Sequence, residues 1–187
     1  GDFTLTETTN AVTKLEVGTD SEAVGSVAFV NANTLTLAKV QVDGKIAITT
    51  QEGDITIKED ITTQSVATDA VVVNAGKNAN KGVTTGGDIK IEDAPTISTG
   101  ANGIIQLLSG TAANSTGLSA LADTFKAYAD ETSNFTFSVG TTNVLYRDAN
   151  TTNNNSLYFD GANDYVALNE SPLADGATEF TIELWIK

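Results

Sequence analysis

The fold of this chain is decided by a short stretch near its middle, Gly53-Asp54-Ile55-Thr56-Ile57-Lys58-Glu59-Asp60. The sequence repeats this stretch 34 residues later as Gly87-Asp88-Ile89-Lys90-Ile91-Glu92-Asp93-Ala94. In both copies a Gly-Asp turn signal precedes an Ile-x-Ile alternation, which is typical of a strand with one buried face. A pair of carboxylates then follows the apolar residues. These shared features predict two equivalent strands in two equivalent repeat units.

The same offset of 34 residues superposes two further strand candidates. A repeat period of about 20–50 residues with strand content is typical of coils that stack on one another. We therefore predict an all-β chain with a parallel β-solenoid-like repeat region, in which short strands stack in register and bury Ile, Val and Leu in a narrow core. The period is clearest at residues 53–110, and the further superpositions are Ala70-Val71-Val72-Val73-Asn74 on Ile104-Ile105-Gln106-Leu107-Leu108 and Thr62-Thr63 on Thr96-Ile97.

Alternating apolar residues extend the strand pattern beyond the repeat. The stretch from Val24 to Gln51 reads as a more degenerate coil, and the segment from Gly1 to Asp20 holds strand candidates without a repeat mate. The 29 Thr residues suit the exposed faces of strands, and the 16 Gly residues suit turns. An antiparallel β-sandwich array would also give short strands at regular spacing, and it is the alternative fold.

A late group of apolar residues carries two expectations. Leu118, Leu121, Phe125 and Tyr128 lie at spacings of three and four, which predicts a helical turn from Leu118 to Tyr128. A stack of coils also needs a closing plug. We expect the late aromatic residues to cap the end of the core, and they are Phe125, Tyr128, Phe135, Phe137 and Tyr146.

The composition excludes several kinds of chemistry. The chain has 187 residues, a formal net charge of −14, and neither His nor Cys. It therefore lacks His- and Cys-ligated metal sites, Ser-His or Cys-His nucleophile pairs and disulfides. The negative charge opposes binding to nucleic acid or anionic lipid. We expect no enzyme, no nucleic-acid partner and no membrane insertion, and we nominate no catalytic, cofactor-binding or metal-binding residue.

Two carboxylate pairs, Glu59-Asp60 and Glu92-Asp93, occupy equivalent places in the repeat. They could form a calcium ladder or an acid/base pair, since a composition that leaves carboxylates as the strong metal ligands favours hard cations such as calcium. The simpler interpretation is that they are strand-ending charges that keep an exposed edge soluble. We favour the simpler interpretation, because repetition suits an architectural role better than a single active site. The glycine-rich residues 82–87 lack the Lys-Ser/Thr pair of a phosphate-binding loop.

A change in composition divides the chain. We expect a β-rich repeat region over residues 1–147 and a polar linker over residues 148–155. Residues 156–187 hold two or three strand candidates, which are too few to bury a core alone. We expect this last segment to be the incomplete N-terminal part of a further domain.

The last segment resembles the start of a laminin-G/concanavalin-like domain of bacterial surface proteins. The likeness rests on Ser156-Leu157-Tyr158-Phe159-Asp160-Gly161-Ala162-Asn163-Asp164-Tyr165-Val166 and on Phe180-Thr181-Ile182-Glu183-Leu184-Trp185-Ile186-Lys187. The resemblance implies a jelly-roll sandwich that binds carbohydrate or protein, in some members with calcium. No binding residue carries over, because the ligand-bearing loops of the family lie further along the chain.

The body of the chain resembles repeat units of giant secreted surface adhesins of Bacteroidetes. The likeness rests on Gly53-Asp54-Ile55-Thr56-Ile57, Val71-Val72-Val73-Asn74-Ala75-Gly76-Lys77-Asn78 and Ser109-Gly110-Thr111 with Ser115-Thr116-Gly117-Leu118. Such adhesins include gliding-motility adhesins exported by the type 9 secretion system. The resemblance implies an extracellular or cell-surface stalk that presents adhesive modules. Its partners would be surface polysaccharide, host or substratum ligands, or cell-surface and secretion proteins.

A second function stays open at this point. The chain would instead belong to a glycan-binding or carbohydrate-active secreted protein if its working module lay beyond residue 187. The sequence that follows Lys187, or the response of a completed sandwich to a set of glycans, would distinguish this function from that of a stalk.

Overall fold

A computed structural model describes residues 1–18, 24–80, 83, 85–121, 124–127, 137 and 139–147. The chain divides into two compact units, Gly1–Asn153 and Asn154–Lys187, and the described residues all lie in the first. The predicted linker at 148–155 and the predicted laminin-G-like segment at 156–187 lie outside the described residues. The first unit is all-β, as the sequence predicted.

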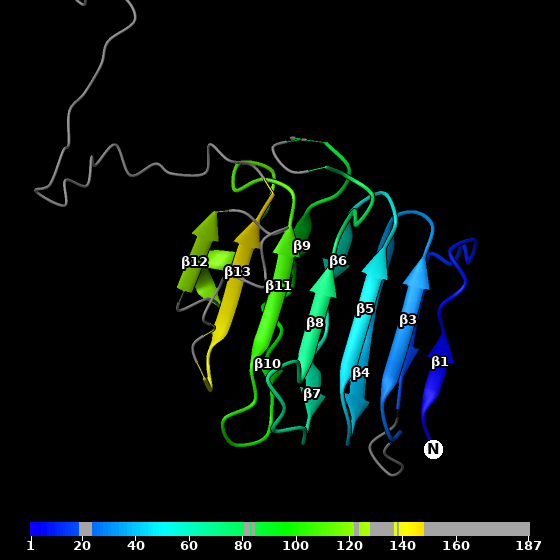
Figure 1. Ribbon diagram of the computed structural model, residues 1–187, viewed down its shortest axis with the longest axis vertical. Helices are drawn as coiled ribbons and strands as arrows, with labels where there is room; N and C mark the ends of the chain where they lie inside the picture. The colour runs from blue at the N-terminus through cyan, green and yellow to red at the C-terminus, as the bar shows by residue number, and fades with distance from the viewer. Residues whose placement is uncertain are drawn as a thin grey trace, which may run out of the picture. The chain divides into compact units, whose positions relative to one another are not determined.

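One sheet of the unit, sheet A, has seven strands and faces the viewer in Figure 1. Every pair of neighbouring strands in it is parallel. In spatial order the strands are β1 (Phe3–Leu5), β3 (Val27–Asn31), β5 (Ile46–Thr50), β8 (Val71–Asn74), β11 (Ile105–Ser109), β13 (Thr142–Tyr146) and β12 (Thr124–Ala127).

The second sheet, sheet B, lies behind the first in Figure 1, and its described pairs are also parallel. The long strand β4 spans two neighbours in the next turn of the chain, because it pairs with β6 along its first half and with β7 along its second. The order is β10 (Ile97–Ser98), β7 (Ile61–Thr63), β4 (Leu35–Val42), β6 (Ile55–Ile57) and β9 (Ile89–Ile91), and β2 (Lys14–Val17) also pairs with β4.

From β1 to β10 the chain crosses from sheet A to sheet B and back and adds strands to both sheets, whereas β11, β12 and β13 all join sheet A. We call each such turn a coil. All described strand pairs are parallel, so the antiparallel sandwich array is wrong for this unit. The six coils are β1 with β2, β3 with β4, β5 with β6 and β7, β8 with β9 and β10, β11 with the 3-10 helix Leu118–Ala120, and last β12 with β13, of which β12 forms the edge of sheet A.

The predicted offset of 34 residues separates the register partners in two of the strand pairs. Ile55 pairs with Ile89, and Val71 pairs with Ile105. The superposition of Thr62 on Thr96 is wrong, because Thr62 pairs with Ser98. The coils also differ in length. Far fewer residues separate the register partners Val27 and Ile46 than separate the register partners Ile105 and Thr142. The N-terminal strand candidates without a repeat mate form the first coil, β1 and β2.

Inward-facing residues of both sheets form one core. Alternate positions of β3, β5, β8 and β11 point into it, and Val27, Ile46, Val71 and Ile105 form one continuous row. Sheet B supplies Leu35, Ile55 and Ile89 as the matching row. The stacked rows explain why the Ile-x-Ile pattern recurs, because each row continues the same apolar interior from coil to coil.

The helix predicted from Leu118 to Tyr128 is wrong beyond its first turn. A 3-10 helix covers only Leu118–Ala120, and Leu118 is buried in the core. Residues Thr124–Ala127 form β12, which pairs in parallel with β13. Pairing with an existing sheet edge outweighs a helical apolar spacing that is only two turns long.

The predicted aromatic plug is only partly where it was expected. Tyr146 lies in the core, but Phe137 packs with Leu108 and Leu145 in a separate cluster. Those two leucines alternate with core residues of β11 and β13, so their cluster lies on the outer face of sheet A. Phe125 lies in β12, while Tyr128 and Phe135 are outside the described residues.

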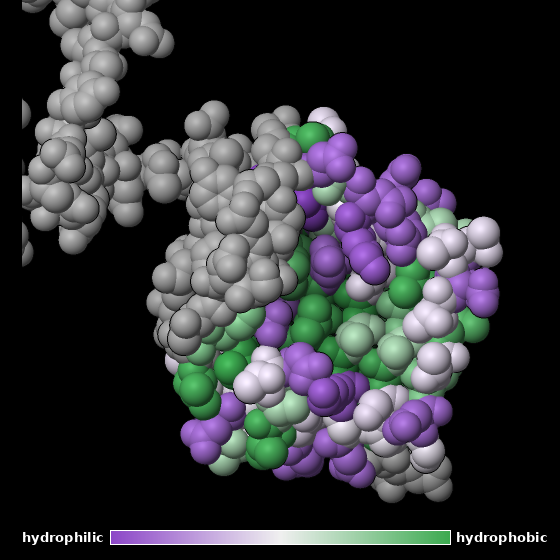
Figure 2. Space-filling view, viewed as in Figure 1, coloured by the Kyte–Doolittle hydropathy of each residue, from purple (hydrophilic) through white to green (hydrophobic). Residues whose placement is uncertain are grey.

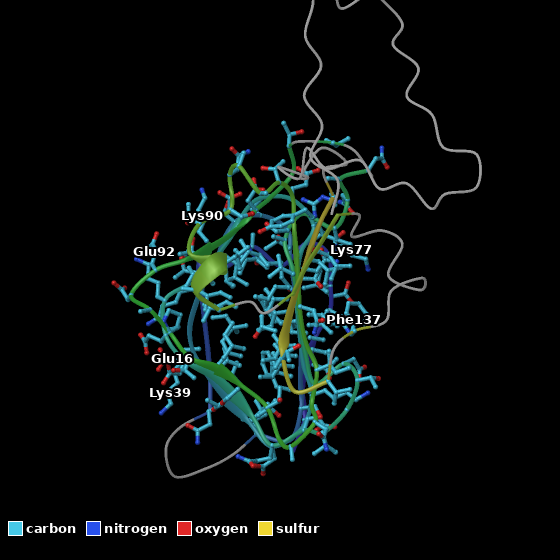
Figure 3. The ribbon with its side chains drawn as sticks, turned by 90° about the vertical axis from the view of Figure 1, so that its left-hand side faces the viewer. Glu16, Lys39, Lys77, Lys90, Glu92 and Phe137 are labelled. Carbon is cyan, nitrogen blue, oxygen red and sulfur yellow. The ribbon has the colours of Figure 1, made fainter. Side chains whose placement is uncertain are left out.

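The outer faces of the two sheets differ in character. Apolar residues gather over the middle of sheet A in Figure 2, where Ala28, Ala47 and Val72 form an outward row. On the sheet B side, Figure 3 shows Lys90 and Glu92, while Lys77 and Phe137 lie on the opposite side. Part of the outward face of sheet A is therefore apolar, although the many Thr residues suit the exposed faces of strands.

Candidate functional site

The two predicted carboxylate pairs come together at one corner of the coils. Glu59 and Asp60 connect β6 to β7, and Glu92 and Asp93 connect β9 to β10 one coil later. Around them lies an open hollow of about 340 Å³, which Lys39, Lys58, Glu59, Asp60, Asp93, Ala94 and Pro95 line.

Contacts between the two coils already use several charges at this corner. The Nζ of Lys58 lies 2.8 Å from the Oε2 of Glu92. This hydrogen bond and the charge of Glu92 raise the pKa of Lys58. The Oδ1 of Asp60 accepts a hydrogen bond from the backbone N–H of Thr96 at 2.7 Å. Asp60 and Glu92 thus join one coil to the next. The described residues contain no group of three or more His, Cys, Asp or Glu side chains that could hold a metal ion.

The bond from Asp60 is one case of a repeated contact. The Oδ1 of Asp54 accepts from the N–H of Asp88 at 2.9 Å, and the Oδ1 of Asp88 accepts from the N–H of Thr111 at 2.7 Å. The Oδ1 of Asp2 likewise accepts from the N–H of Ser26 at 2.7 Å. In each case the carboxylate lies in one coil and the donor lies in the next coil along the chain. We call these four residues, Asp2, Asp54, Asp60 and Asp88, the coupling aspartates.

A lysine strengthens one of these contacts. The Nζ of Lys90 lies 2.5 Å from the Oδ2 of Asp54, while the other carboxylate oxygen of Asp54 holds the N–H of Asp88. The hydrogen bond and the charge of Asp54 raise the pKa of Lys90. A single carboxylate therefore binds both the backbone and a side chain of the following coil. Hydrogen bonds to a charged group are stronger than those between neutral groups.

Buried polar side chains provide a second set of contacts between coils, at the ends of the sheet A strands. Asn31 is fully buried, and its amide both accepts from the N–H of Val12 at 2.9 Å and donates to the carbonyl of Val12 at 3.0 Å. Thr50, its neighbour in register, accepts from the N–H of Gly76 at 2.9 Å. Ser109 accepts from the N–H of Ile89 at 2.8 Å. These side chains bind backbone groups at a place where the sheet ladder has ended.

Arg147 follows β13 and is 4% exposed. Its Nη1 donates to the carbonyl of Ala75 at 2.5 Å, and its Nη2 donates to the carbonyl of Gly87 at 2.6 Å. Its Nε has no hydrogen-bond partner in the described part of the chain. Burial lowers the pKa of Arg147, although the charge of Asp88 acts in the opposite direction. The guanidinium thus lies two coils away from the strand that it follows.

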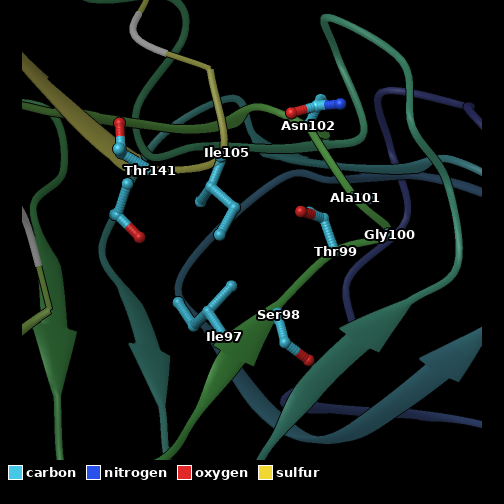
Figure 4. A pocket seen from close by; sticks show the side chains of 10 residues that line it. Ile97, Ser98, Thr99, Gly100, Ala101, Asn102, Ile105 and Thr141 are labelled. Carbon is cyan, nitrogen blue, oxygen red and sulfur yellow. The ribbon is translucent and has the colours of Figure 1, made fainter.

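An open pocket of about 440 Å³ lies beside β10 and the start of β13 (Figure 4). Ile97 and Ile105 supply apolar surface, and Ser98, Thr99 and Asn102 supply hydroxyl and amide groups. None of its lining residues is charged. The hydroxyl of Thr99 already donates to the carbonyl of Gly103 at 3.2 Å. The pocket offers neutral hydrogen-bonding groups and lacks an acid, a base or a nucleophile activated by a base.

The glycine-rich residues 82–87 also contribute to the stacking, within their described part. The carbonyl of Gly86 accepts from the N–H of Gly53 at 2.8 Å, and that of Gly87 accepts from Arg147. Carbonyl oxygens directed at neighbouring coils do not form an anion-binding loop, because such a loop presents N–H groups.

Sequence reasoning found the carboxylate pairs, and with them Asp60, but it missed Arg147 and the other three coupling aspartates, Asp2, Asp54 and Asp88. Asp54 and Asp88 had a signal, because both follow a Gly and precede an Ile-x-Ile strand in the repeat. Arg147 had none, since its partners at Ala75 and Gly87 lie 72 and 60 residues away.

Comparison of this chain with family models, with curated proteins and with solved structures gives no match. In the described part of the chain, no helix has the length and apolar character needed to cross a membrane.

Proposed function

We propose that this unit is a load-bearing stalk segment of a large extracellular surface adhesin, and that it presents adhesive modules away from the cell. The observation that carries the proposal is the repeated contact from an aspartate in one coil to a backbone N–H in the next. These contacts supplement the parallel ladders of both sheets. They give three of the interfaces between coils, the first with the second, the third with the fourth and the fourth with the fifth, a bond that does not depend on the apolar core.

Such an arrangement supports a mechanical role for a physical reason. In a stacked repeat each coil contacts only its neighbours, so a stalk is as strong as its weakest interface between coils. Charge-assisted bonds at Asp54, Asp60 and Asp88 lie at three different points of those interfaces. An interface that is held at several points resists peeling, because several bonds must break before a strand is released.

Within this proposal the protein acts outside the cell and catalyses no reaction. Its partners are surface polysaccharide, host or substratum ligands, or the cell-surface and secretion proteins that hold the adhesin. The coils provide length and stiffness, and modules that they carry provide the adhesion. A contribution to gliding motility fits the same role, because an adhesin that transmits traction must withstand load.

Single-molecule pulling on the complete chain, with handles at its two ends, tests the proposal. We expect Gly1–Asn153 to unfold in discrete steps, each of which releases the length of one or a few coils at about 3.3–3.6 Å per residue. A chain that extends without any force peak, as a chain unfolded in urea does, would rule out the load-bearing role.

Glycan binding is the second candidate, and the uncharged pocket beside β10 favours it on this unit. Ser98 and Asn102 can exchange hydrogen bonds with the hydroxyl groups of a neutral sugar, and Ile97 can contact its apolar face. A glycan array that is probed with the complete chain tests this candidate. Binding that Asn102→Ala removes would support it, and the absence of binding to any sugar would favour the stalk alone.

A further inference from the structure

The fourth coil contributes both β9 and β10 to sheet B, and the fifth coil covers only one of them. Thr116 of the fifth coil pairs with Lys90 of β9. In the described part of the chain, β10 pairs with β7 on one side and forms the edge of sheet B on the other. The uncharged pocket of about 440 Å³ is lined by β10, by Ile105 of the fifth coil and by Thr142 of the sixth. It therefore lies on the open side of β10, where a next strand of sheet B would lie.

The backbone of Ile97 presents two hydrogen-bonding groups to this open side. Ile61 of β7 donates its N–H to the carbonyl of Thr96 at 2.9 Å, and Ile61 is the register partner of Ile97. In a parallel pair with this pattern, the N–H and C=O of Ile97 point away from β7. Neither group has a hydrogen bond within the part of the chain that the structure describes.

Ile89 of β9 shows what such groups bind when the next coil covers them. Its N–H donates to the Oγ of Ser109 at 2.8 Å, and its carbonyl accepts from the N–H of Thr116 at 3.3 Å. Both partners belong to the fifth coil. An edge strand with an unpaired N–H and C=O is a template for a further strand. Ile97 therefore offers a peptide the same two bonds that Ile89 makes inside the fold.

The side chains around the pocket indicate which peptide would fit. Val40, Ile61 and Ile97 form one inward row of sheet B, in which the first two are fully buried and Ile97 is only partly buried. In Figure 4 the side chains of Ile97 and Ile105 point toward one another across the pocket. An aliphatic side chain between them would extend the row and cover the exposed part of Ile97. No lining residue is charged, so a charged side chain would find no partner there.

We propose that the pocket beside β10 is a strand-acceptor site, in which a partner protein donates an extended, uncharged segment that pairs in parallel with β10. The segment places one aliphatic side chain between Ile97 and Ile105. In this mode of recognition the main-chain hydrogen bonds supply affinity, and the pocket for a side chain supplies selectivity. The unpaired N–H and C=O of Ile97 favour a strand over a sugar. This site does not depend on the stalk role of the unit.

The test measures the binding of a short peptide to the complete chain. The peptide has the sequence of residues 61–66, Ile-Thr-Thr-Gln-Ser-Val, with an acetyl group and an amide at its ends. We choose it because Ile61 already pairs in register with Ile97 from the other side, and because it carries no charge. In the same register on the open edge, its acetyl carbonyl would accept from the N–H of Ile97. The N–H of its second residue would donate to the carbonyl of Ile97.

Two N-methylated peptides form a matched pair. A methyl group on the second residue removes the N–H that faces Ile97, whereas a methyl group on the third residue removes an N–H that faces away from β10. We expect the first methyl group to weaken binding at least about tenfold, because the carbonyl of Ile97 loses its donor, and the second to change it by less than about twofold.

Hydrogen exchange, followed for single amides by NMR, locates the bound peptide. The N–H of Ile97 should exchange at least about tenfold more slowly when the unmethylated peptide is bound, because it gains an acceptor. The N–H of Ile61 is already bonded to Thr96 and should not change. On the protein side, Ile97→Pro removes an N–H that the fold leaves unused, and proline is tolerated at a sheet edge. We expect this variant to fold and to lose peptide binding.

Several results would overturn the strand-acceptor site. They are failure of the unmethylated peptide to bind at millimolar concentration, equal weakening by the two methyl groups, and unchanged binding to a folded Ile97→Pro variant. An N–H of Ile97 as protected as that of Ile61 in the free chain would also overturn it, since the edge would already be filled. A neutral sugar that binds, and that Asn102→Ala releases, while the peptide does not bind would assign the pocket to glycan instead. If Ile97→Pro does not fold, as circular dichroism would show, the two methylated peptides decide the question alone.

Discussion

Asp54 and Asp88 occupy the same place in two successive coils, and the Oδ1 of Asp54 accepts a hydrogen bond from the backbone N–H of Asp88 at 2.9 Å. Asp88 repeats the contact with the N–H of Thr111 in the coil after it. The bonds run in one direction along the stack, from carboxylate to the following backbone. This directional chain of contacts leads to the predictions below.

Replacing Asp88 with Ala should lower the free energy of unfolding by about 2–3 kcal/mol, because the buried N–H of Thr111 would lose its acceptor and Arg147 would lose a nearby opposite charge. Urea unfolding measures the change. The control is Asp69→Ala, since the ion pair of Asp69 with Lys45 is exposed and its loss should cost at most about 1 kcal/mol. Equal losses for both variants would contradict the coupling role of Asp88.

Substitutions at two glycines can distinguish the cost of a left-handed backbone conformation from the cost of a steric clash with a neighbouring coil. Gly76 and Gly140 have nearly the same φ, 68° and 69°. A Cβ at Gly76 would collide with the carbonyl of Gly86, whereas a Cβ at Gly140 would meet no atom within 4 Å. Gly140→Ala should therefore cost about 1–2 kcal/mol, which is the cost of the left-handed conformation alone, and Gly76→Ala should cost clearly more. Thermal unfolding compares them, and equal costs would mean that the coils are not packed closely at Gly76.

Alkaline pH should destabilise the unit. The pKa of Lys90 is raised above 10.5 by Asp54, and the pKa of Tyr146 is raised above 10.0 by burial. A group with a raised pKa in the folded state binds its proton more tightly there than in the unfolded state. It therefore stabilises the fold fully at a pH below its unfolded pKa, and this stabilisation is lost as the pH rises through its folded pKa. The free energy of unfolding should be constant near pH 8 and fall from about pH 10 upward, as urea titrations at each pH would show.

Tyr146→Phe provides the control for that titration. The variant removes one of the three groups with a raised pKa, the others being Lys58 and Lys90, so its stability should fall less steeply with pH than that of the parent chain. An identical slope for variant and parent would exclude Tyr146 as a contributor.

Calcium should raise the melting temperature only slightly. Asp60 already accepts the N–H of Thr96 and Glu92 is paired with Lys58, so a cation at this corner would have to displace existing contacts. Asp60→Asn should lower the melting temperature by the same amount with and without calcium. A large rise with calcium in the parent chain that Asp60→Asn abolishes would show that the corner is a metal site.

The sequence predicted the main features of the fold because they depend on local alternation. Ile55 with Ile89 and Val71 with Ile105 could be aligned, since an unbroken repeat places equivalent residues at one offset. Thr62 could not be aligned with its partner Ser98, because the corner of the fourth coil contains two additional residues. Asp93 and Ala94 have positive φ there, at 59° and 52°, and an ungapped offset does not detect such an insertion.

The candidate site was less predictable, for a different reason. Glu59, Asp60, Glu92 and Asp93 were visible as a repeated pair, but their hydrogen-bond acceptors and donors depend on which backbone groups the coils bring near them. Arg147 binds carbonyl groups, which every residue has, so no residue type in the sequence indicates its partners. Hydrogen bonds from a side chain to the backbone of another coil can be predicted only after the register of the coils is known.

Disulfide trapping tests the central claim, that successive coils stack in parallel register, most directly. Ala28 and Ala47 are register partners on the outer face of sheet A, and Val72 is the partner of Ala47 one coil further on. Neighbouring strands lie about 4.8 Å apart, which is within the range of a disulfide, whereas strands two coils apart are about twice as far. The measurement is the rate of cross-linking under mild oxidation, followed by peptide mass analysis, in the double variants Ala28→Cys/Ala47→Cys and Ala28→Cys/Val72→Cys. The account predicts rapid cross-linking of the first pair and none of the second, and a first pair that cross-links no faster than the second would contradict it.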